Sequence, residues 1–229
     1  MDNTLFDLVG AKQAACREVA AFLGERDGEA LFSYFLRPVR GFEDPQNIRD
    51  YLQDRGLFSD AAFRECAGIY QEVKLREIVT YPGVAETLAV LSRHGFPLAL
   101  VTDAHQRDAV PRLEKIALLN RFDCVVTHDM TWQKKPSVVP FLYALQRLGA
   151  DPPGTIVIGD SPRRDIAPAR SLGMRTVYAR YGDRFSQTRG DGGAEYVIDD
   201  IRELLALLGC GTGPRDEGGG QCAAGLPSR

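Results

Sequence analysis

Two aspartates that follow a short apolar segment are the strongest candidates for chemistry in this sequence. The segment TIVIG is followed by Asp160, and Asp165 comes five residues later. Carboxylates at the end of a strand can hold a hard divalent cation through their oxygen atoms. The same residues also fit a simple helix start, because Ser161 can cap a helix and Pro162 suits its first turn. Taken alone, these residues fit a metal site and a capped turn equally well.

Three other candidate sites are polar residues elsewhere in the chain. Thr102 and Asp103 follow an apolar run, where a hydroxyl and backbone N–H groups can bind phosphate, although a helix N-cap is the more common role. Lys135 precedes Pro136, and its ammonium could neutralise a phosphate or a carboxylate, although most such lysines are solvated. Asp2 could act as a general acid, although acidic residues this near a chain end are usually exposed.

Composition limits the class of protein. The chain has 229 residues, 44% of them hydrophobic, and a formal net charge of −3. This length can bury a core, and the charge does not favour nucleic acid as a partner. No apolar stretch approaches the roughly 20 residues that span a bilayer, and no signal-peptide pattern opens the chain, so no membrane partner is predicted. The five cysteines are scattered without a CxxC pair, which favours a reducing, cytoplasmic location.

Two patterns divide the chain. Residues 6–79 carry apolar residues at three-to-four spacing, which predicts helices. From residue 80 to 208, short apolar runs alternate with amphipathic segments, which predicts an α/β fold with a doubly wound parallel sheet. Ligands of such sheets bind at the carboxyl ends of the strands. The glycine-rich tail, 209–229, is predicted to be disordered. The predicted strands are 97–102, 122–127, 155–159, 174–179 and 195–198, and the predicted helices lie near 84–94, 106–118, 137–148, 164–172 and 200–208.

Four segments, in their order along the chain, resemble the motifs of the haloacid dehalogenase superfamily. They are DNTLFD, LVTDA, KKP and IVIGDSPRRDI, and each lies on the kind of predicted element that its motif requires. The resemblance extends from residue 2 to about residue 180. It implies a Rossmann-like α/β core, residues 1–11 and 80–208, with an inserted helical cap at residues 12–79.

The first segment implies a pair of aspartates that act on phosphate esters. In this superfamily one aspartate attacks phosphorus and forms a phosphoaspartyl intermediate, and a second aspartate two residues later serves as acid and base. Residues i and i+2 of an extended chain point the same way, so both carboxylates face the substrate. Asp2 matches the second aspartate, which puts the nucleophile before Met1. We therefore expect an upstream start, and a central strand between the strands that end at Thr102 and Gly159.

The other segments imply a phosphate site and a metal site. By resemblance, the Thr102 hydroxyl and the backbone N–H at Asp103 bind phosphoryl oxygens, and Lys135 pairs with the phosphate and the nucleophile. By resemblance, Asp160 binds Mg²⁺ directly, and Asp165 supports the metal directly or through its water shell. The upstream aspartate and the backbone carbonyl of Asp2 are the other expected ligands. A phosphate and several carboxylates need such positive charge around them.

The function that the resemblance implies is Mg²⁺-dependent hydrolysis of a small phosphate monoester. Sugar or triose phosphates, phosphoglycolate and glyceraldehyde 3-phosphate are the expected substrates, because a cap of this size suits a small molecule. The expected assembly is a monomer or a homodimer. Three alternatives share the fold. A 2-haloacid dehalogenase is disfavoured by the Asp160–Asp165 pair, and an inactive binding or regulatory protein is disfavoured by the presence of Asp2 and Lys135. A phosphomutase stays open.

Overall fold

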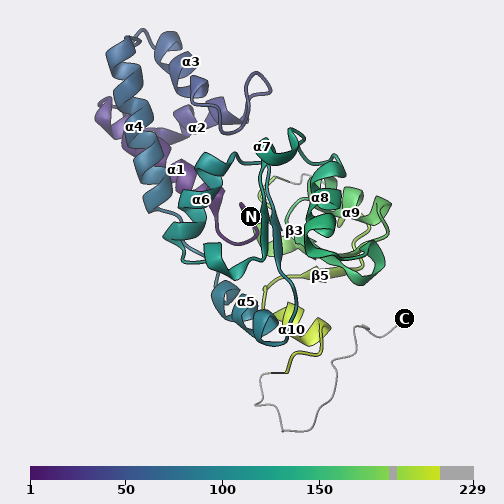
Figure 1. The fold of residues 1–229 in the computed structure, drawn as a ribbon. Coiled ribbons are helices and arrows are strands. Elements are labelled where there is room, and N and C mark those ends of the chain that lie inside the picture. The colour runs from purple at the N-terminus through teal and green to yellow at the C-terminus, as the bar shows by residue number, and fades with distance from the viewer. Residues whose placement is uncertain (186–189, 212–229) are drawn as a thin grey trace. The chain divides into compact units, whose positions relative to one another are not determined.

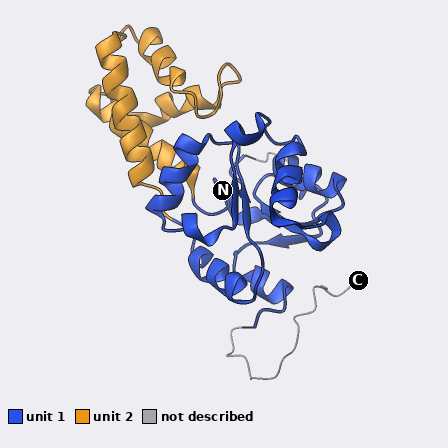
Figure 2. Cartoon of the chain, viewed as in Figure 1, with its two compact units in different colours: residues 1–6, 80–229 blue, residues 7–79 orange. Residues whose placement is uncertain are grey.

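The computed structural model describes residues 1–185 and 190–211, which form two compact units (Figures 1 and 2). Unit 1 consists of Met1–Phe6 and the described residues from Thr80 onward, and unit 2 is Asp7–Val79. Unit 2 begins five residues before the boundary expected from the sequence. The reason is local, because Asp7 caps the first helix by accepting a hydrogen bond from the Gly10 backbone N–H at 2.9 Å. Most of the predicted tail, 212–229, lies outside the described residues.

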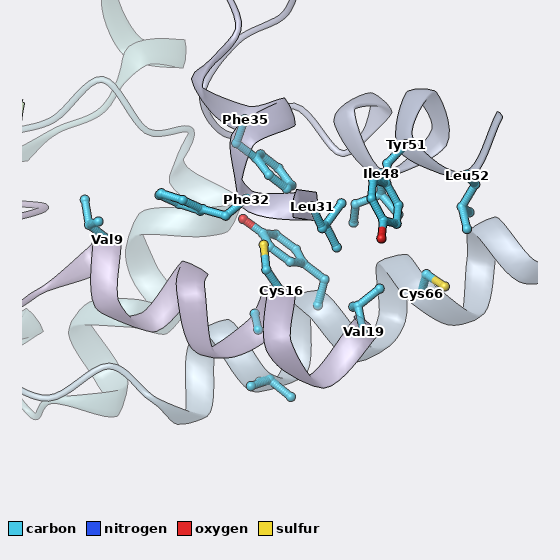
Figure 3. Close-up of a cluster of buried hydrophobic side chains, with 13 residues drawn as sticks. Val9, Cys16, Val19, Leu31, Phe32, Phe35, Ile48, Tyr51, Leu52 and Cys66 are labelled. Carbon is cyan, nitrogen blue, oxygen red and sulfur yellow. The ribbon is translucent and has the colours of Figure 1, made fainter. Parts of the chain in front are cut away.

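Unit 2 is helical, as the apolar spacing predicted. Its helices are α1 (Leu8–Phe22), α2 (Gly28–Leu36), α3 (Gln46–Asp54) and α4 (Asp60–Arg76). Each contributes side chains to one buried cluster, in which Figure 3 labels, among others, Cys16, Leu31, Tyr51 and Cys66. Burying an aliphatic or aromatic side chain of this kind stabilises a fold by about 1.5–3 kcal/mol. The unit therefore has a hydrophobic core of its own.

Unit 1 contains the expected alternation of strands and helices, and the α/β fold class is confirmed. Most elements lie within a few residues of their predicted bounds. The short helix α7 was not predicted, and the helix predicted near 164–172 begins instead with a π-helical turn, Pro162–Ile166. The strands are β1 (Ala99–Val101), β2 (Cys124–Val126), β3 (Ile156–Gly159), β4 (Arg175–Ala179) and β5 (Tyr196–Ile198); the helices are α5 (Val84–Arg93), α6 (Gln106–Lys115), α7 (His128–Thr131), α8 (Val139–Leu148), α9 (Ala167–Ser171) and α10 (Glu203–Leu207), with 3-10 turns at Leu119–Arg121, Pro152–Gly154 and Arg180–Gly182.

The parallel sheet of unit 1 forms in two pieces. Strand β1 pairs with β2, while β3, β4 and β5 form the second piece in that order. Among the described residues, β1 and β3 do not pair with each other; the sequence analysis placed a further strand between them. A cavity of about 200 Å³ lies between them and is lined by apolar side chains from both strands. The chain's N-terminus reaches this central region of unit 1 (Figure 1).

Helix α8 holds the two pieces of the sheet together. Ala144 packs with Val126 of β2, and Leu145 packs with Met174, which directly precedes β4. One amphipathic helix thus covers both pieces, so the carboxyl ends of β1 and β3 come to the same edge of the unit. Within residues 1–185 and 190–211, no helix is long and apolar enough to span a lipid bilayer.

Candidate active site

The carboxyl ends of β1 and β3 are joined by a buried ion pair. Lys135 Nζ lies 2.6 Å from Asp165 Oδ1, and the two side chains are 10% and 8% exposed. Lys135 also donates its backbone N–H to Asp103 Oδ1 at 2.9 Å, and Nζ lies 3.4 Å from the Val101 carbonyl oxygen. The loop that carries Lys135 is therefore bound to the end of β1, and its ammonium reaches across to the segment after β3.

The segment after β3 folds back so that Asp165 faces the end of its own strand. The π-helical turn inserts one more residue than an α-turn, and Asp165 Oδ2 accepts a hydrogen bond from the Ser161 backbone N–H at 3.0 Å. Turns of this type recur at functional sites. Gly159 makes the close approach possible, because a Cβ there would lie 2.4 Å from Asp165 Cβ. Glycine at this position is a steric requirement.

Asp160 lies at the same strand end and is 5% exposed. Its Oδ1 accepts a hydrogen bond from Thr4 Oγ1 at 2.7 Å, across 156 positions of the sequence. Burial, reinforced by the negative charge of Asp165, raises the pKa of Asp160 to about 6. Asp160 therefore carries negative charge that its present partners compensate only in part.

The lysine and the second aspartate stabilise each other's charge. Burial alone would lower the pKa of Lys135, but the carboxylates of Asp165 and Asp103 raise that pKa above its ordinary value. Burial alone would raise the pKa of Asp165, but the Lys135 ammonium holds it below its ordinary value. The pair is therefore charged on both sides at neutral pH.

The two phosphate-site candidates on the loop after β1 already have local partners. Thr102 is 4% exposed, and its Oγ1 accepts a hydrogen bond from the Ala104 backbone N–H at 3.2 Å. Asp103 accepts the Lys135 backbone N–H, and its Oδ2 lies 3.8 Å from Arg164 Nη1. Thr102 thus closes a local turn and is not the N-cap of α6, which is His105, while Asp103 connects this loop to the lysine loop.

The Asp2 carboxylate is paired with a residue that the sequence analysis missed. Asp2 Oδ1 lies 3.0 Å from Nη1 of Arg112 on α6, and the Arg112 side chain is only 2% exposed. The available signal was its spacing, because Arg112 follows Ala109 by three residues and precedes Leu113, and both of these are buried. The structure thus joins Lys135 to Asp165 and Asp103 directly, whereas Asp2 contacts the basic side chain of α6.

The loop that carries Asp2 is also held from the side of β4. The Tyr181 hydroxyl donates a hydrogen bond to the Thr4 carbonyl oxygen at 2.8 Å. Gly182 packs against the same loop, where a Cβ would lie 1.6 Å from the Asn3 carbonyl oxygen. Neither Tyr181 nor Gly182 stood out in the sequence, because both lie in an irregular turn without periodicity.

The carboxylates at the strand ends fit a hard cation in part. Asp160 and Asp165 offer buried oxygen donors of the type that Mg²⁺ prefers, and the raised pKa of Asp160 marks uncompensated negative charge. Over the ranges that the structure describes, no three His, Cys, Asp or Glu side chains gather into a metal site. The described side chains thus bring two carboxylates, those of Asp160 and Asp165, to this strand end.

Comparison with known proteins identifies the family. The family model of haloacid dehalogenase-like hydrolases matches residues 1–179. The chain belongs to this family. The resemblance inferred from the four sequence segments is therefore confirmed, and those segments lie on the strand ends and loops that surround the Lys135–Asp165 pair.

Relatives of this haloacid dehalogenase-like protein include curated enzymes and solved structures. A phosphoglycolate phosphatase of Pseudomonas syringae pv. syringae is 33% identical over 220 residues, which cover 90% of this chain and 76% of the relative. A phosphoglycolate phosphatase of Chromobacterium violaceum is 34% identical over 139 residues, and the chain spans 61% of its length. A HAD phosphatase from Thermococcus onnurineus has a crystal structure that is 25% identical, with a TM-score of 0.64, over 91% of this chain and 95% of that one.

Proposed function

We propose that this site hydrolyses a small phosphate monoester with the help of Mg²⁺. The observation that carries the proposal is the buried Lys135–Asp165 pair beside Asp160, at the carboxyl ends of the strands in a haloacid dehalogenase-like core. One fixed ammonium and two carboxylate ligands can balance the charge of a phosphate group in a buried site.

Each residue has a proposed role in this reaction. Thr102 and the backbone N–H at Asp103 bind phosphoryl oxygens, and Lys135 neutralises the charge that develops on the phosphoryl group. Asp2 protonates the leaving oxygen and then takes a proton from the attacking water. Asp160 would hold Mg²⁺ directly and Asp165 directly or through water, with the Asp2 backbone carbonyl as a further ligand. When bound, Mg²⁺ supplies positive charge that stabilises the transition state.

The proposed nucleophile is an aspartate two positions before Asp2, upstream of Met1, which forms a phosphoaspartyl intermediate. The cavity between β1 and β3 supports this proposal, because apolar side chains of both strands line it together with Met1 and Lys135. An extended apolar segment in that cavity would pair with both strands and lead directly into Asp2. Its last carboxylate would then lie on the same side of the chain as that of Asp2.

Small phosphorylated metabolites are the proposed substrates. The relatives named phosphoglycolate phosphatase make phosphoglycolate the first compound to test, followed by triose and sugar phosphates. We propose that the helical unit, Asp7–Val79, selects among them, as a cap that encloses small molecules. The proposed setting is the cytoplasm, and the proposed assembly is a monomer or homodimer.

A paired assay tests this function. Two proteins are compared: the printed chain, and the same chain preceded by an apolar strand that ends in an aspartate next to Met1. The substrate is 4-nitrophenyl phosphate, with Mg²⁺ or with EDTA. We expect release of phosphate from the extended chain only, and only with Mg²⁺. If both proteins are folded by circular dichroism and neither releases phosphate, the hydrolase proposal is wrong and the inactive binding protein is favoured.

The same proteins distinguish the other two enzymes. A phosphomutase would convert a sugar phosphate into its isomer with little free phosphate, so both products are measured in one reaction. A 2-haloacid dehalogenase would release halide from 2-chloropropionate in the presence of EDTA. Phosphate release from several monoesters, without isomer or halide, is the result that the proposal requires.

A further inference from the structure

A buried arginine reaches the carboxylate of Asp2 from helix α6. Arg112 is 2% exposed, and its Nη1 lies 3.0 Å from Asp2 Oδ1. Burying a guanidinium costs several kcal/mol unless it is paired and hydrogen-bonded. Arg112 therefore occupies a buried position on α6 that an aliphatic side chain would fill at lower cost. One contact of the Arg112 guanidinium is the Asp2 carboxylate at the candidate site.

The position of helix α6 in the chain brings Arg112 to the site. The helix begins at Gln106, directly after the loop that contains Thr102 and Asp103. Its buried face consists of Ala109, Arg112 and Leu113, which have the three-to-four spacing of one helix side. The same helix that follows the phosphate-site loop thus contacts Asp2.

The loop of Asp2 is held at a second point on the opposite side. Thr4 donates its hydroxyl to Asp160 at 2.7 Å, and the Thr4 carbonyl accepts the Tyr181 hydroxyl at 2.8 Å. Two residues after Asp2, the backbone is thus attached to the β3–β4 side of the unit. With Thr4 held there, the Arg112 contact on the other side sets the direction of the Asp2 carboxylate.

We propose that Arg112 is a positioning residue for Asp2. This inference rests on the proposed function, in which the oxygen of the upstream aspartate bonds to phosphorus while the bond between phosphorus and the leaving oxygen breaks and its electron pair goes to that oxygen. The Asp2 carboxyl group supplies the proton that the leaving oxygen takes up. In the second step, water oxygen bonds to phosphorus and Asp2 takes a proton of that water. The bond between phosphorus and the upstream aspartate oxygen breaks, and its electron pair returns to that carboxylate. Arg112 holds the Asp2 side chain in one orientation and does not touch the reacting atoms.

The leaving group offers a readout that a purely structural role would not affect. A 4-nitrophenolate ion leaves without being protonated, whereas an alkoxide is a poor leaving group unless a general acid protonates it. If Arg112 positions that acid, its loss slows hydrolysis of alkyl phosphates and largely spares the nitrophenyl ester. A general loss of folded protein would reduce both reactions by the same factor.

The experiment measures kcat/KM for glycerol 3-phosphate and for 4-nitrophenyl phosphate. It uses the full chain in the form that releases phosphate in the paired assay, with Arg112→Leu, Arg112→Lys and, as a matched control, Arg107→Leu. Arg107 lies on the same helix with 83% of its side chain exposed. We expect Arg112→Leu to lower the alkyl reaction about 100-fold and the aryl reaction less than about 3-fold, the size of a lost general acid. Arg112→Lys should recover part of the alkyl rate, and Arg107→Leu should change neither rate.

An equal fall for both substrates, or no fall for either, overturns the inference. A thermal-unfolding cycle of Arg112→Lys, Asp2→Asn and the double variant tests the contact independently of turnover. We expect the two single substitutions to lower the unfolding temperature by amounts that do not add in the double variant. Additive shifts would mean that Arg112 does not hold Asp2. If the unsubstituted protein hydrolyses neither ester, the proposed function fails, and the cycle still decides whether the two residues are coupled.

Discussion

Lys135 and Asp165 connect the two halves of the candidate site through atoms 2.6 Å apart, with about nine-tenths of each side chain buried. They come from segments 30 positions apart in the sequence, one after β2 and one after β3. A buried pair of this kind adds little net stability compared with apolar side chains, because both charges lose their hydration. Its presence is better explained by chemistry at the strand ends than by a structural need.

Removing one partner of this pair should be costly. In Lys135→Met, the Asp165 carboxylate stays buried without its ammonium, so we expect the free energy of unfolding to fall by about 3–5 kcal/mol. Urea denaturation followed by circular dichroism measures this change. Lys134→Met is the matched control, because Lys134 is the adjacent lysine and is exposed, and it should change stability by less than about 0.5 kcal/mol. Equal effects of the two substitutions would contradict a buried, functional pair.

Gly159 should not tolerate even one added methyl group. A Cβ at this position would lie 2.4 Å from Asp165 Cβ and 2.6 Å from Asp165 Oδ2, so Asp165 would have to move. We expect Gly159→Ala to lower the free energy of unfolding by about 1–3 kcal/mol, as overpacked cores do. It should also abolish phosphate release by the active form of the chain.

Gly154→Ala is the control for that substitution. A Cβ at Gly154 would meet no atom within 4 Å, so stability and turnover should stay close to those of the parent. A fully active Gly159→Ala protein would show that the position of Asp165 is not critical to the site.

The Thr4 hydroxyl should stabilise the protein through Asp160. Thr4→Val keeps the shape of the side chain but removes the donor that lies 2.7 Å from Asp160 Oδ1. The buried carboxylate then lacks one of its hydrogen bonds, so the free energy of unfolding should fall by about 1–3 kcal/mol. Thr155→Val removes a bond of 2.8 Å to the Asp151 carbonyl at an exposed position, and it should cost clearly less. Denaturation of both variants in EDTA provides the comparison, and equal losses would contradict a special role for Thr4.

The order of elements in unit 1 could be predicted because short apolar runs and amphipathic helices differ in period. The same patterns placed Asp160 and Thr102 at strand ends, where the structure has them. Contacts made by long side chains could not be predicted in this way. Arg112 reaches Asp2 across 110 positions, and Tyr181 reaches Thr4 across 177 positions. Such contacts depend on how helices and turns pack in space, which local periodicity does not record.

Two details that differed from expectation coincide with side-chain hydrogen bonds. The π-helical turn after Ser161 forms because Asp165 is drawn back toward Ser161 and Lys135. The boundary of unit 2 depends on the side chain of Asp7, which caps α1. In both places side-chain hydrogen bonds favour a backbone conformation that hydrophobic periodicity leaves open.

The Cys16 thiol should make the stability of unit 2 fall as the pH rises in the alkaline range. This thiol on α1 is fully buried, and burial raises its pKa from an ordinary value of 9.0 to about 12. Between these two pH values the folded chain keeps the proton and the unfolded chain loses it. The stabilisation is therefore present below pH 9 and is lost as the pH rises toward 12, with a slope of about 1.4 kcal/mol per pH unit for one proton.

This dependence is tested by denaturation of the parent, Cys16→Ala and Val19→Ala from pH 8, which is below the window set by the thiol pKa values, to about pH 11, which is inside it. Both substitutions remove buried atoms from the same face of α1, since Val19 is also fully buried. Both should therefore lower stability at pH 8. Only Cys16→Ala should reduce the fall of stability with pH, because it alone removes the thiol. If all three curves run parallel, the Cys16 thiol does not stay protonated in the folded chain, and its burial does not control the alkaline limit of this unit.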